Sequence, residues 1–226
     1  MPKNLNDKIW FKECLNNKDL ISKIEKIKLV ITDVDGCLTN GTIDIGISRK
    51  YFPMVELLPT NKHISKFYDL ILSWLATEKN LDKNFSTQDG FAINKTLESD
   101  NLKIAFLSGR RDEATSIRAD MLGVPQDMCF IGIHEKKINI VKNIQENKNI
   151  SIDETLYFGD DYLDFETKPS IGLFACPINT PFYFKDASDL IIPKKGGQHA
   201  FRLLLDLVLY VQKKHFAQEF IKNSLR

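Results

Sequence analysis

Short apolar runs alternate with helix-forming stretches along most of this chain, and this alternation is the feature that most constrains its fold. Each run is rich in Val, Ile, Leu or Phe and is followed by Gly, Pro or polar residues, as expected of buried strands that end in turns. Such an order is typical of a parallel sheet with helices on its faces, joined by right-handed crossovers. We therefore predict a doubly wound α/β fold. The predicted strands are 28–34, 103–107, 128–131, 155–158, 172–175 and 190–192, and the predicted helices are 19–27, 91–99, 112–122, 135–147 and 199–220.

The length of 226 residues suits one domain around one hydrophobic core, so we predict a single domain over 1–226, with a helical extension at 1–26. The stretch 46–88 breaks the strand and helix rhythm. It follows a hairpin strand predicted at 42–45, and it contains an amphipathic helix predicted at 64–75. This insertion either packs on the core, covers a site or meets another subunit, and the sequence leaves the three open.

Charge and composition exclude several classes of function. Lys and Arg number 31 against 30 Asp and Glu, so no overall field attracts nucleic acid or anionic lipid, and we expect a small partner. Apolar runs fall far short of the ~20 residues that a membrane span needs. The N-terminal residues lack the apolar core of a signal peptide, which predicts a cytoplasmic protein. The 4 Cys and 4 His are scattered, so we predict buried, reduced thiols and no zinc or histidine metal site.

Two groups of acidic residues follow predicted strands. Asp33 and Asp35, in Asp-Val-Asp-Gly, lie two residues apart, so on a strand both carboxylates would project together where it ends. Like charges held close together need a cation between them, or a proton on one of them. Mg²⁺ provides the first and general acid chemistry uses the second. Asp160, Asp161 and Asp164 follow the strand at 155–158, and two acidic strand ends can share one metal ion.

Two further elements supply groups that bind anions. Ser108, Gly109 and Arg110 follow the strand at 103–107, where a hydroxyl and backbone N–H groups just before a helix make an anion seat. Lys136 begins the helix after the next strand and offers a cation. Taken singly, Ser108 is typical of a turn and Lys136 of a solvated surface. The order of all four elements along one chain is what indicates a catalytic site.

This order resembles the haloacid dehalogenase superfamily of phosphotransferases, and within it the 3-deoxy-D-manno-octulosonate 8-phosphate and acylneuraminate 9-phosphate phosphatases, which lack a separate cap domain. The resemblance runs from residue 28 to about 211. The segments that carry it are Asp35-Gly36-Cys37-Leu38-Thr39-Asn40-Gly41, Gln88-Asp89-Gly90-Phe91-Ala92-Ile93, Leu107-Ser108-Gly109-Arg110, Arg118-Ala119-Asp120-Met121-Leu122-Gly123, Gly159-Asp160-Asp161 and Gly196-Gly197.

The resemblance implies a Mg²⁺-dependent phosphatase. Mg²⁺ would be held by the Asp33 carboxylate, the Asp35 backbone carbonyl and the Asp160 carboxylate. Asp33 would attack phosphorus to form an aspartyl-phosphate, and Asp35 would act as general acid and then base. The phosphate would be bound by Ser108, Gly109, Arg110 and Lys136. Asp161 and Asp164 would orient waters bound to the metal, or else serve as helix caps or solvated carboxylates.

Departures from the family pattern lie on the substrate side. The insertion at 46–88 is longer than the usual link, Asn40 stands where Asp is frequent, Ala92 where a second Gly is common, and His199 where a Gly is expected. We therefore expect the phosphatase reaction to be kept. Phosphorylated sugar acids of lipopolysaccharide or capsule synthesis are the leading substrate class, followed by other small phosphorylated building blocks of that pathway. The resemblance also implies a homo-tetramer, whose assembly the insertion can alter.

Two other interpretations remain. An acidic pocket with Ser and Lys on a doubly wound sheet also describes phospho-accepting signalling domains, although these are usually much shorter. The chain can also be a catalytically weak relative that acts as a binding or scaffold subunit through its insertion. Turnover of a generic aryl phosphate with Mg²⁺ distinguishes an enzyme from both.

Overall fold

The computed structural model describes residues 7–42, 44–45, 81–98, 102–133 and 135–226. The chain divides into two units, Met1–Thr42 with Asn84–Arg226, and Ile43–Lys83. In the second unit the described residues form strands β2 (Asp44–Ile45) and β3 (Leu81–Asp82), which pair antiparallel. The hairpin strand predicted at 42–45 is thus present in part. The helix predicted at 64–75 and most of the predicted insertion lie outside the described residues.

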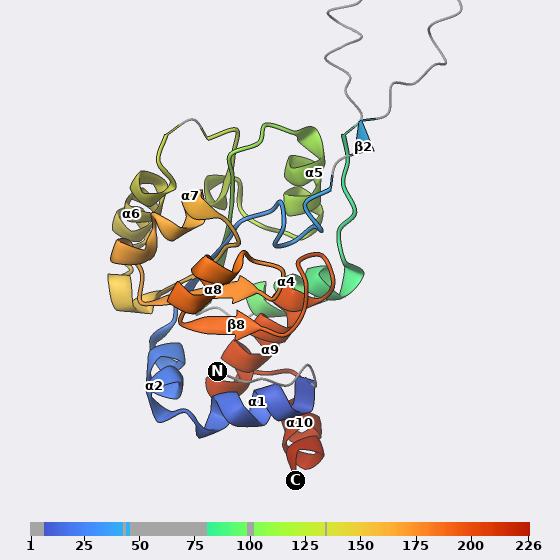
Figure 1. Cartoon of the computed structure of the whole chain (residues 1–226), viewed down its shortest axis with the longest axis vertical. Coiled ribbons are helices and arrows are strands. Elements are labelled where there is room, and N and C mark those ends of the chain that lie inside the picture. The colour runs from blue at the N-terminus through green and yellow to red at the C-terminus, as the bar shows by residue number, and fades with distance from the viewer. Residues whose placement is uncertain (1–6, 43, 46–80, 99–101, 134) are drawn as a thin grey trace, which may run out of the picture. The chain divides into compact units, whose positions relative to one another are not determined.

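The larger unit is built on a six-stranded sheet in which every neighbouring pair is parallel, in the order β5-β4-β1-β6-β7-β8. All six predicted strands are present, and the predicted doubly wound α/β class is confirmed (Figure 1). The strand β1 lies inside the sheet with all four residues buried, which explains why its sequence is continuously apolar rather than alternating. The strands are β1 (Leu29–Thr32), β4 (Lys103–Ser108), β5 (Cys129–Ile131), β6 (Thr155–Phe158), β7 (Leu173–Pro177) and β8 (Leu190–Ile192).

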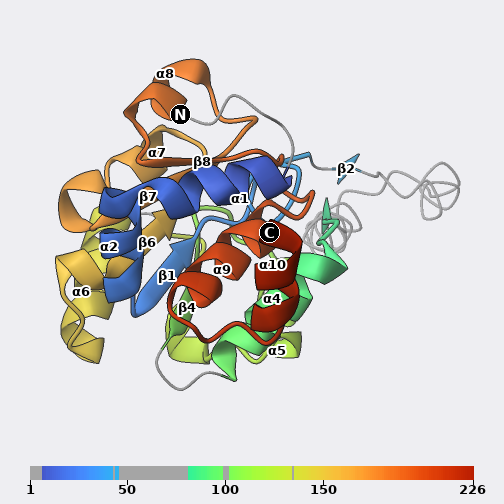
Figure 2. The ribbon, with the colours of Figure 1, turned by 90° about the horizontal axis from the view of Figure 1, so that it is seen from below.

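Helices cover the sheet. The helix α4 packs against α9, and both N-terminal helices, α1 and α2, also contact α9 (Figure 2). Single 3₁₀ turns lie at Gln126–Met128, Ile152–Glu154 and Lys168–Ser170. The α-helices are α1 (Asp7–Asn16), α2 (Lys18–Lys26), α4 (Thr87–Leu97), α5 (Glu113–Met121), α6 (Lys137–Lys148), α7 (Tyr162–Phe165), α8 (Phe182–Ala187), α9 (Ala200–Val211) and α10 (Gln218–Leu225).

The single helix predicted at 199–220 is wrong, because the chain forms two helices there. The first, α9, ends where Lys213 takes a left-handed φ of 59° and the backbone N–H of Lys214 donates to the Leu209 carbonyl at 2.8 Å. His215 then turns back to Asp206, with Nε2 and Oδ1 2.9 Å apart. The residues after Val211 are polar and interrupt the apolar stripe that α9 buries. Further helical turns would therefore bury no apolar side chains, and the helix ends.

The motif Asp89-Gly90 on α4 brings that helix together with two others, α9 and α5. Asp89 is buried on α4, and its Oδ1 accepts a hydrogen bond from the Arg202 backbone N–H at 2.7 Å, in the first turn of α9. A carboxylate at this place satisfies an otherwise unpaired N–H and complements the helix dipole. A Cβ on Gly90 would stand 2.3 Å from Arg118 Nη2, so the glycine lets α4 and α5 approach.

The N-terminal helix α1 anchors its segment by burying Trp10, Phe11 and Cys14, and Trp10 Nε1 donates to the Ile191 carbonyl at 2.8 Å. The cysteines are all unpaired: Cys14, Cys37 and Cys176 are buried, and Cys129 is half-buried. The predicted burial is thus found for three of the four thiols and not for Cys129. Among the described helices, none is both long enough and apolar enough to cross a membrane.

Candidate active site

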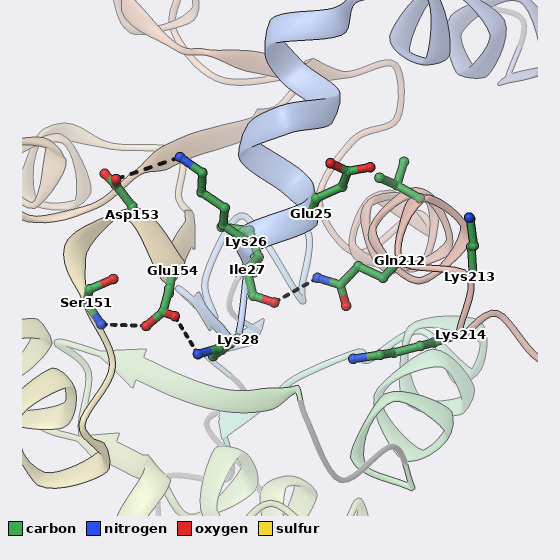
Figure 3. A pocket seen from close by; sticks show the side chains of 11 residues that line it. Glu25, Lys26, Ile27, Lys28, Ser151, Asp153, Glu154, Gln212, Lys213 and Lys214 are labelled. Atoms are coloured by element: carbon green, nitrogen blue, oxygen red, sulfur yellow. Dashed lines mark hydrogen bonds and ion pairs between the residues drawn. The ribbon is translucent and has the colours of Figure 1, made fainter.

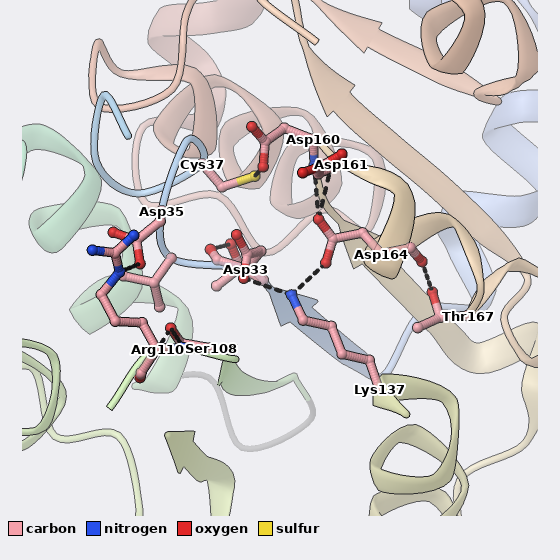
Figure 4. Close-up of polar contacts among 12 residues, drawn as sticks. Asp33, Asp35, Cys37, Ser108, Arg110, Lys137, Asp160, Asp161, Asp164 and Thr167 are labelled. Atoms are coloured by element: carbon pink, nitrogen blue, oxygen red, sulfur yellow. Dashed lines mark hydrogen bonds and ion pairs between the residues drawn. The ribbon is translucent and has the colours of Figure 1, made fainter. Parts of the chain in front are cut away.

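The candidate site lies where β4, β1 and β6 end side by side. In the register of the sheet, Thr32 stands beside Phe106 on one neighbour and Phe158 on the other. The Asp33 backbone N–H donates to the Phe158 carbonyl at 2.9 Å, which extends the pairing to the first aspartate. Ser108 lies two residues after Phe106, and Asp160 lies two residues after Phe158. The predicted elements therefore meet at the carboxyl edge of the sheet, near its switch point (Figure 4).

A tight turn carries the chain away from β1. Gly36 has a φ of 91°, and a Cβ there would stand 2.1 Å from Asp160 Oδ2. Only glycine tolerates both the left-handed backbone and this close approach. The backbone N–H groups of Leu38 and Thr39 donate to the Val34 carbonyl at 2.9 Å and 3.0 Å, which closes the turn.

The two carboxylates of the Asp-Val-Asp motif meet different partners. The strand ends at Thr32, before the predicted end at 34, so the alternation of a strand does not reach Asp35. Asp33 is buried and faces Lys137, whereas Asp35 is half-buried, with Oδ2 3.2 Å from Arg110 Nε (Figure 4). Each aspartate therefore has its own cation beside it.

The cation beside Asp33 is Lys137, and not the predicted Lys136 one residue before it. Lys137 is buried, and its Nζ lies 2.7 Å from Asp33 Oδ1. Lys136 is the exposed N-cap of α6, so its side chain lies in solvent. The sequence does carry a signal, because Lys137 shares a helix face with Ile140, Val141 and Ile144, all buried. A lysine on an apolar stripe needs a buried anion as its partner.

Asp164 joins the lysine to the acidic loop. It is 1% exposed, and its Oδ1 accepts from Lys137 Nζ at 2.6 Å and from the Tyr157 hydroxyl at 2.7 Å. Its Oδ2 accepts from the backbone N–H groups of Asp160 and Asp161 at 3.0 Å and 3.2 Å. Asp164 thus positions both the lysine and the loop. Asp161 is exposed and caps α7, with its Oδ1 accepting from the Tyr162 N–H at 2.6 Å.

Asp33, Cys37 and Asp160 place their side-chain donor atoms within 4.8 Å of one another. Burial, and then the charge of Asp164, raise the pKa of Asp33 well above its ordinary value, although Lys137 opposes this. Burial and the charges of Asp164 and Asp161 raise the pKa of Asp160 to about 7. Burial lowers the pKa of Lys137, but Asp164 and Asp33 outweigh burial and leave it raised. The aspartates at this place carry more negative charge than Lys137 carries positive charge.

This donor set fits a divalent cation. Asp33 is buried and Asp160 half-buried, and two such neighbouring carboxylates repel each other less when a dication binds between them. Carboxylate oxygen is a preferred ligand of Mg²⁺. The close approach of the donor atoms of Asp33 and Asp160 beside Asp164 is the observation that supports this, and Asp33 and Asp160 are the residues that would hold the ion.

Ser108, Gly109 and Arg110 follow β4 as predicted, but the helix does not begin directly after them. Ser108 is 1% exposed, and its Oγ accepts from the Arg110 backbone N–H at 3.2 Å. The helix α5 begins at Glu113, and its first turn is capped by Asp112, whose Oδ1 accepts from the Thr115 N–H at 2.8 Å. The expected anion seat at a helix N-terminus is therefore occupied by a carboxylate. The turn that begins at Ser108 contacts Asp35 through the ion pair of Arg110 with that aspartate (Figure 4).

A hollow of about 710 Å³ lies at the opposite end of the strands (Figure 3). Its lining includes Lys28, which precedes β1, and Glu154, which precedes β6, and these two form an ion pair at 2.5 Å. Lys26 and Asp153 form a second pair across its wall, at 3.9 Å. No residue of the predicted site lines this hollow, so the hollow is separate from the acidic cluster.

Known proteins resemble this chain over most of its length. No family model matches it. The 3-deoxy-D-manno-octulosonate 8-phosphate phosphatase of Haemophilus influenzae is 29% identical over 205 residues, which cover 89% of this chain and 95% of that protein. This chain is similar to that phosphatase over most of the length of both. The resemblance predicted from the motifs is confirmed.

Solved structures share the fold of this chain. The cobalt-bound form of the Haemophilus influenzae phosphatase matches with a TM-score of 0.67 and 26% identity, over 90% of this chain and 99% of that one. A hydrolase of the haloacid dehalogenase superfamily from Legionella pneumophila matches with a TM-score of 0.69 and 23% identity, over 94% and 96%. Both structures support the predicted α/β fold.

Proposed function

We propose that this chain is a Mg²⁺-dependent phosphomonoesterase that hydrolyses a small phosphorylated sugar acid, with 3-deoxy-D-manno-octulosonate 8-phosphate as the leading candidate. The curated relative that matches nearly the whole chain is a phosphatase named for that substrate, which supports both the enzyme class and the substrate class. Its cobalt-bound structure supports a divalent cation. A place in lipopolysaccharide or capsule synthesis and a cytoplasmic location are further parts of this proposal.

The observation that carries the proposal is the buried ion pair between Lys137 and Asp33, set beside Asp160 and Asp164. A carboxylate that attacks a phosphate dianion meets strong repulsion. A fixed ammonium group 2.7 Å from Asp33 lowers that repulsion without needing to move during the reaction. Burial excludes water, so each of these charges interacts more strongly than it would at the surface.

The metal ion would be held by the carboxylates of Asp33 and Asp160, and by the Asp35 backbone carbonyl as in the family pattern. When bound, it supplies charge neutralisation for the phosphoryl oxygens. Asp164 keeps the Asp160 loop in place through its backbone N–H contacts. Asp161 caps α7, and we assign it no contact with the metal.

The side chains divide the chemistry between them. Asp33 attacks phosphorus and becomes the aspartyl-phosphate, and Asp35, the half-buried carboxylate of the pair, delivers a proton to the departing alkoxide. Asp35 then takes a proton from the water that hydrolyses the intermediate. Lys137, in place of the predicted Lys136, and the Ser108 hydroxyl with the Gly109 N–H bind the phosphoryl oxygens.

Arg110 is the residue we assign to the acidic part of the substrate. Its guanidinium lies beside Asp35, at the outer side of the site, where 37% of its side chain is exposed. A planar guanidinium binds a carboxylate through two parallel hydrogen bonds, which suits a sugar acid better than a neutral sugar. Whether a second subunit completes the site, as the resemblance implies, stays a prediction.

The test is phosphate release from 3-deoxy-D-manno-octulosonate 8-phosphate and from an aryl phosphate, with and without Mg²⁺, in the wild type and Asp33→Asn. We expect Mg²⁺-dependent turnover in the wild type and none in the variant. Thermal unfolding with and without Mg²⁺ provides an independent readout, since the cation should raise Tm in the wild type and less in Asp160→Asn. Turnover that survives Asp33→Asn would contradict the assigned nucleophile.

A further inference from the structure

The thiol of Cys37 borders the candidate metal site, and the proposed reaction makes no use of it. Cys37 is fully buried, and its Sγ lies 3.8 Å from Asp160 Oδ1 (Figure 4). Together with Asp33 it completes the group of three donor atoms within 4.8 Å of one another. Among the described residues, no other group of three acidic, Cys or His side chains comes as close.

The spacing of sulfur and oxygen suits a shared cation. Zinc binds sulfur at about 2.3 Å and carboxylate oxygen at about 2.1 Å, so two such ligands on a tetrahedral ion stand about 3.6 Å apart. Cys37 Sγ and Asp160 Oδ1 are separated by 3.8 Å, and a single ion can therefore contact both after a small side-chain shift.

The local backbone keeps the thiol in this place. Cys37 follows Gly36 in the closed turn after β1, and its own N–H donates to the Val34 carbonyl at 3.4 Å. The Gly197 N–H donates to the Cys37 carbonyl at 2.9 Å from the other side. The thiol is thus held between two loops. Cys176, also buried, faces the Ser188 hydroxyl instead, at 3.1 Å.

Donor chemistry then separates two kinds of cation. Mg²⁺ requires oxygen ligands in an octahedral arrangement and gains nothing from a thiol. Zn²⁺ and Cd²⁺ favour thiolate and accept fewer ligands. A site with two carboxylates and one thiol therefore offers Mg²⁺ an all-oxygen set and offers a thiophilic ion a mixed set.

We propose that the candidate metal site also binds a thiophilic divalent cation, Zn²⁺ or Cd²⁺, through Cys37 Sγ together with the carboxylates of Asp33 and Asp160, and that this ion excludes Mg²⁺. The inference rests on the metal site of the proposed function. On binding, the S–H bond of Cys37 breaks, its electron pair binds the cation and its proton passes to solvent. Because this ion excludes Mg²⁺, the Mg²⁺-dependent reaction stops.

The test is a Cd²⁺ titration of the reduced, chelator-treated full chain, followed by the ultraviolet charge-transfer band of a cadmium-thiolate bond. We expect a band that saturates at one Cd²⁺ per chain and whose midpoint moves to higher Cd²⁺ as Mg²⁺ is added. The band should be absent in Cys37→Val and in Cys37→Ser, which keeps a small polar side chain. It should persist in Cys129→Ala, which removes the half-exposed thiol.

Asp160→Asn, which removes a carboxylate ligand and keeps the thiol, should weaken Cd²⁺ binding by about tenfold or more. A band that persists in the folded Cys37 variants, or that Mg²⁺ leaves unchanged, would place the cadmium elsewhere and overturn the inference. Neither outcome depends on phosphatase activity, so the proposed function stands or falls separately in the phosphate-release assay.

Discussion

Lys137 donates a hydrogen bond to Asp33 over 2.7 Å, although the two residues lie 104 positions apart in the chain. The same ammonium group donates to Asp164 at 2.6 Å, so one lysine joins the end of β1 to the loop after β6. Each carboxylate keeps the ammonium charged inside the protein, and the ammonium stabilises both carboxylates. The pair is therefore both a structural element and the chemical centre of the proposed reaction.

Replacing Lys137 by Met should lower kcat by about 100-fold or more, as loss of a fixed donor to a developing charge does. The same change leaves Asp33 and Asp164 without their cation and should reduce the free energy of unfolding by about 3 kcal/mol. Steady-state kinetics and urea unfolding measure the two effects.

Lys136→Met is the matched control, because Lys136 is the exposed neighbour of Lys137 on the same helix. It should change neither kcat nor stability appreciably. If Lys136→Met were the more damaging change, the assignment of Lys137 would have to be abandoned.

Tyr157→Phe should destabilise the protein by about 2 kcal/mol, since it removes a hydrogen bond to the buried Asp164 carboxylate. The ring itself stays, and its stacking on Phe174, with centroids 5.8 Å apart, is kept. Urea unfolding measures the loss. Tyr162→Phe is the control, because Tyr162 is 58% exposed. Removing its hydroxyl should leave the free energy of unfolding almost unchanged. Equal losses in the two variants would argue against the Asp164 contact.

Asp89 should make stability depend on pH in a recognisable way. Burial raises the pKa of Asp89 from 3.8 to about 6, although the Arg202 N–H opposes this. The folded protein therefore holds the proton more tightly than the unfolded chain does. The contribution of Asp89 to stability is greatest below about pH 4, falls as the pH rises to about 6, and is constant above that, for a total of about 3 kcal/mol.

Asp89→Asn tests this sign, because the amide oxygen can still accept from the Arg202 N–H while the charge is gone. Urea unfolding at pH 4.5 and at pH 7 measures the difference between wild type and variant. We expect the variant to gain stability relative to the wild type at the higher pH. A difference that does not change with pH would show that Asp89 titrates normally.

Gly36→Ala should be far more damaging than Gly123→Ala. Both glycines have a left-handed φ, 91° and 74°, so each substitution costs about 1 kcal/mol of backbone strain. A Cβ at Gly36 also collides with Asp160 Oδ2 at 2.1 Å, whereas a Cβ at Gly123 meets nothing within 4 Å. Thermal unfolding should therefore show a small loss for Gly123→Ala. Gly36→Ala should lower Tm further. It should also abolish the rise in Tm that Mg²⁺ gives the wild type.

The order of the strands and the acidic motifs could be predicted from the sequence because both are local patterns. The six apolar runs became the six parallel strands, and Asp33, Ser108 and Asp160 follow three adjacent strands at one edge. Helix ends were less predictable. The break between α9 and α10 depends on His215 turning back to Asp206, a contact between residues that the apolar period does not register.

Which lysine serves the site was decided only by the tertiary structure. Lys136 and Lys137 are adjacent and chemically identical in the sequence, and motif order accepts either. The helix α6 rotates by about 100° per residue, so packing its apolar face into the hydrophobic core turns one lysine toward Asp33 and the other to solvent. Local sequence determined that acids gather where strands end. The packing of one helix determined which cation neutralises them, because that choice depends on direction in space rather than on position in the chain.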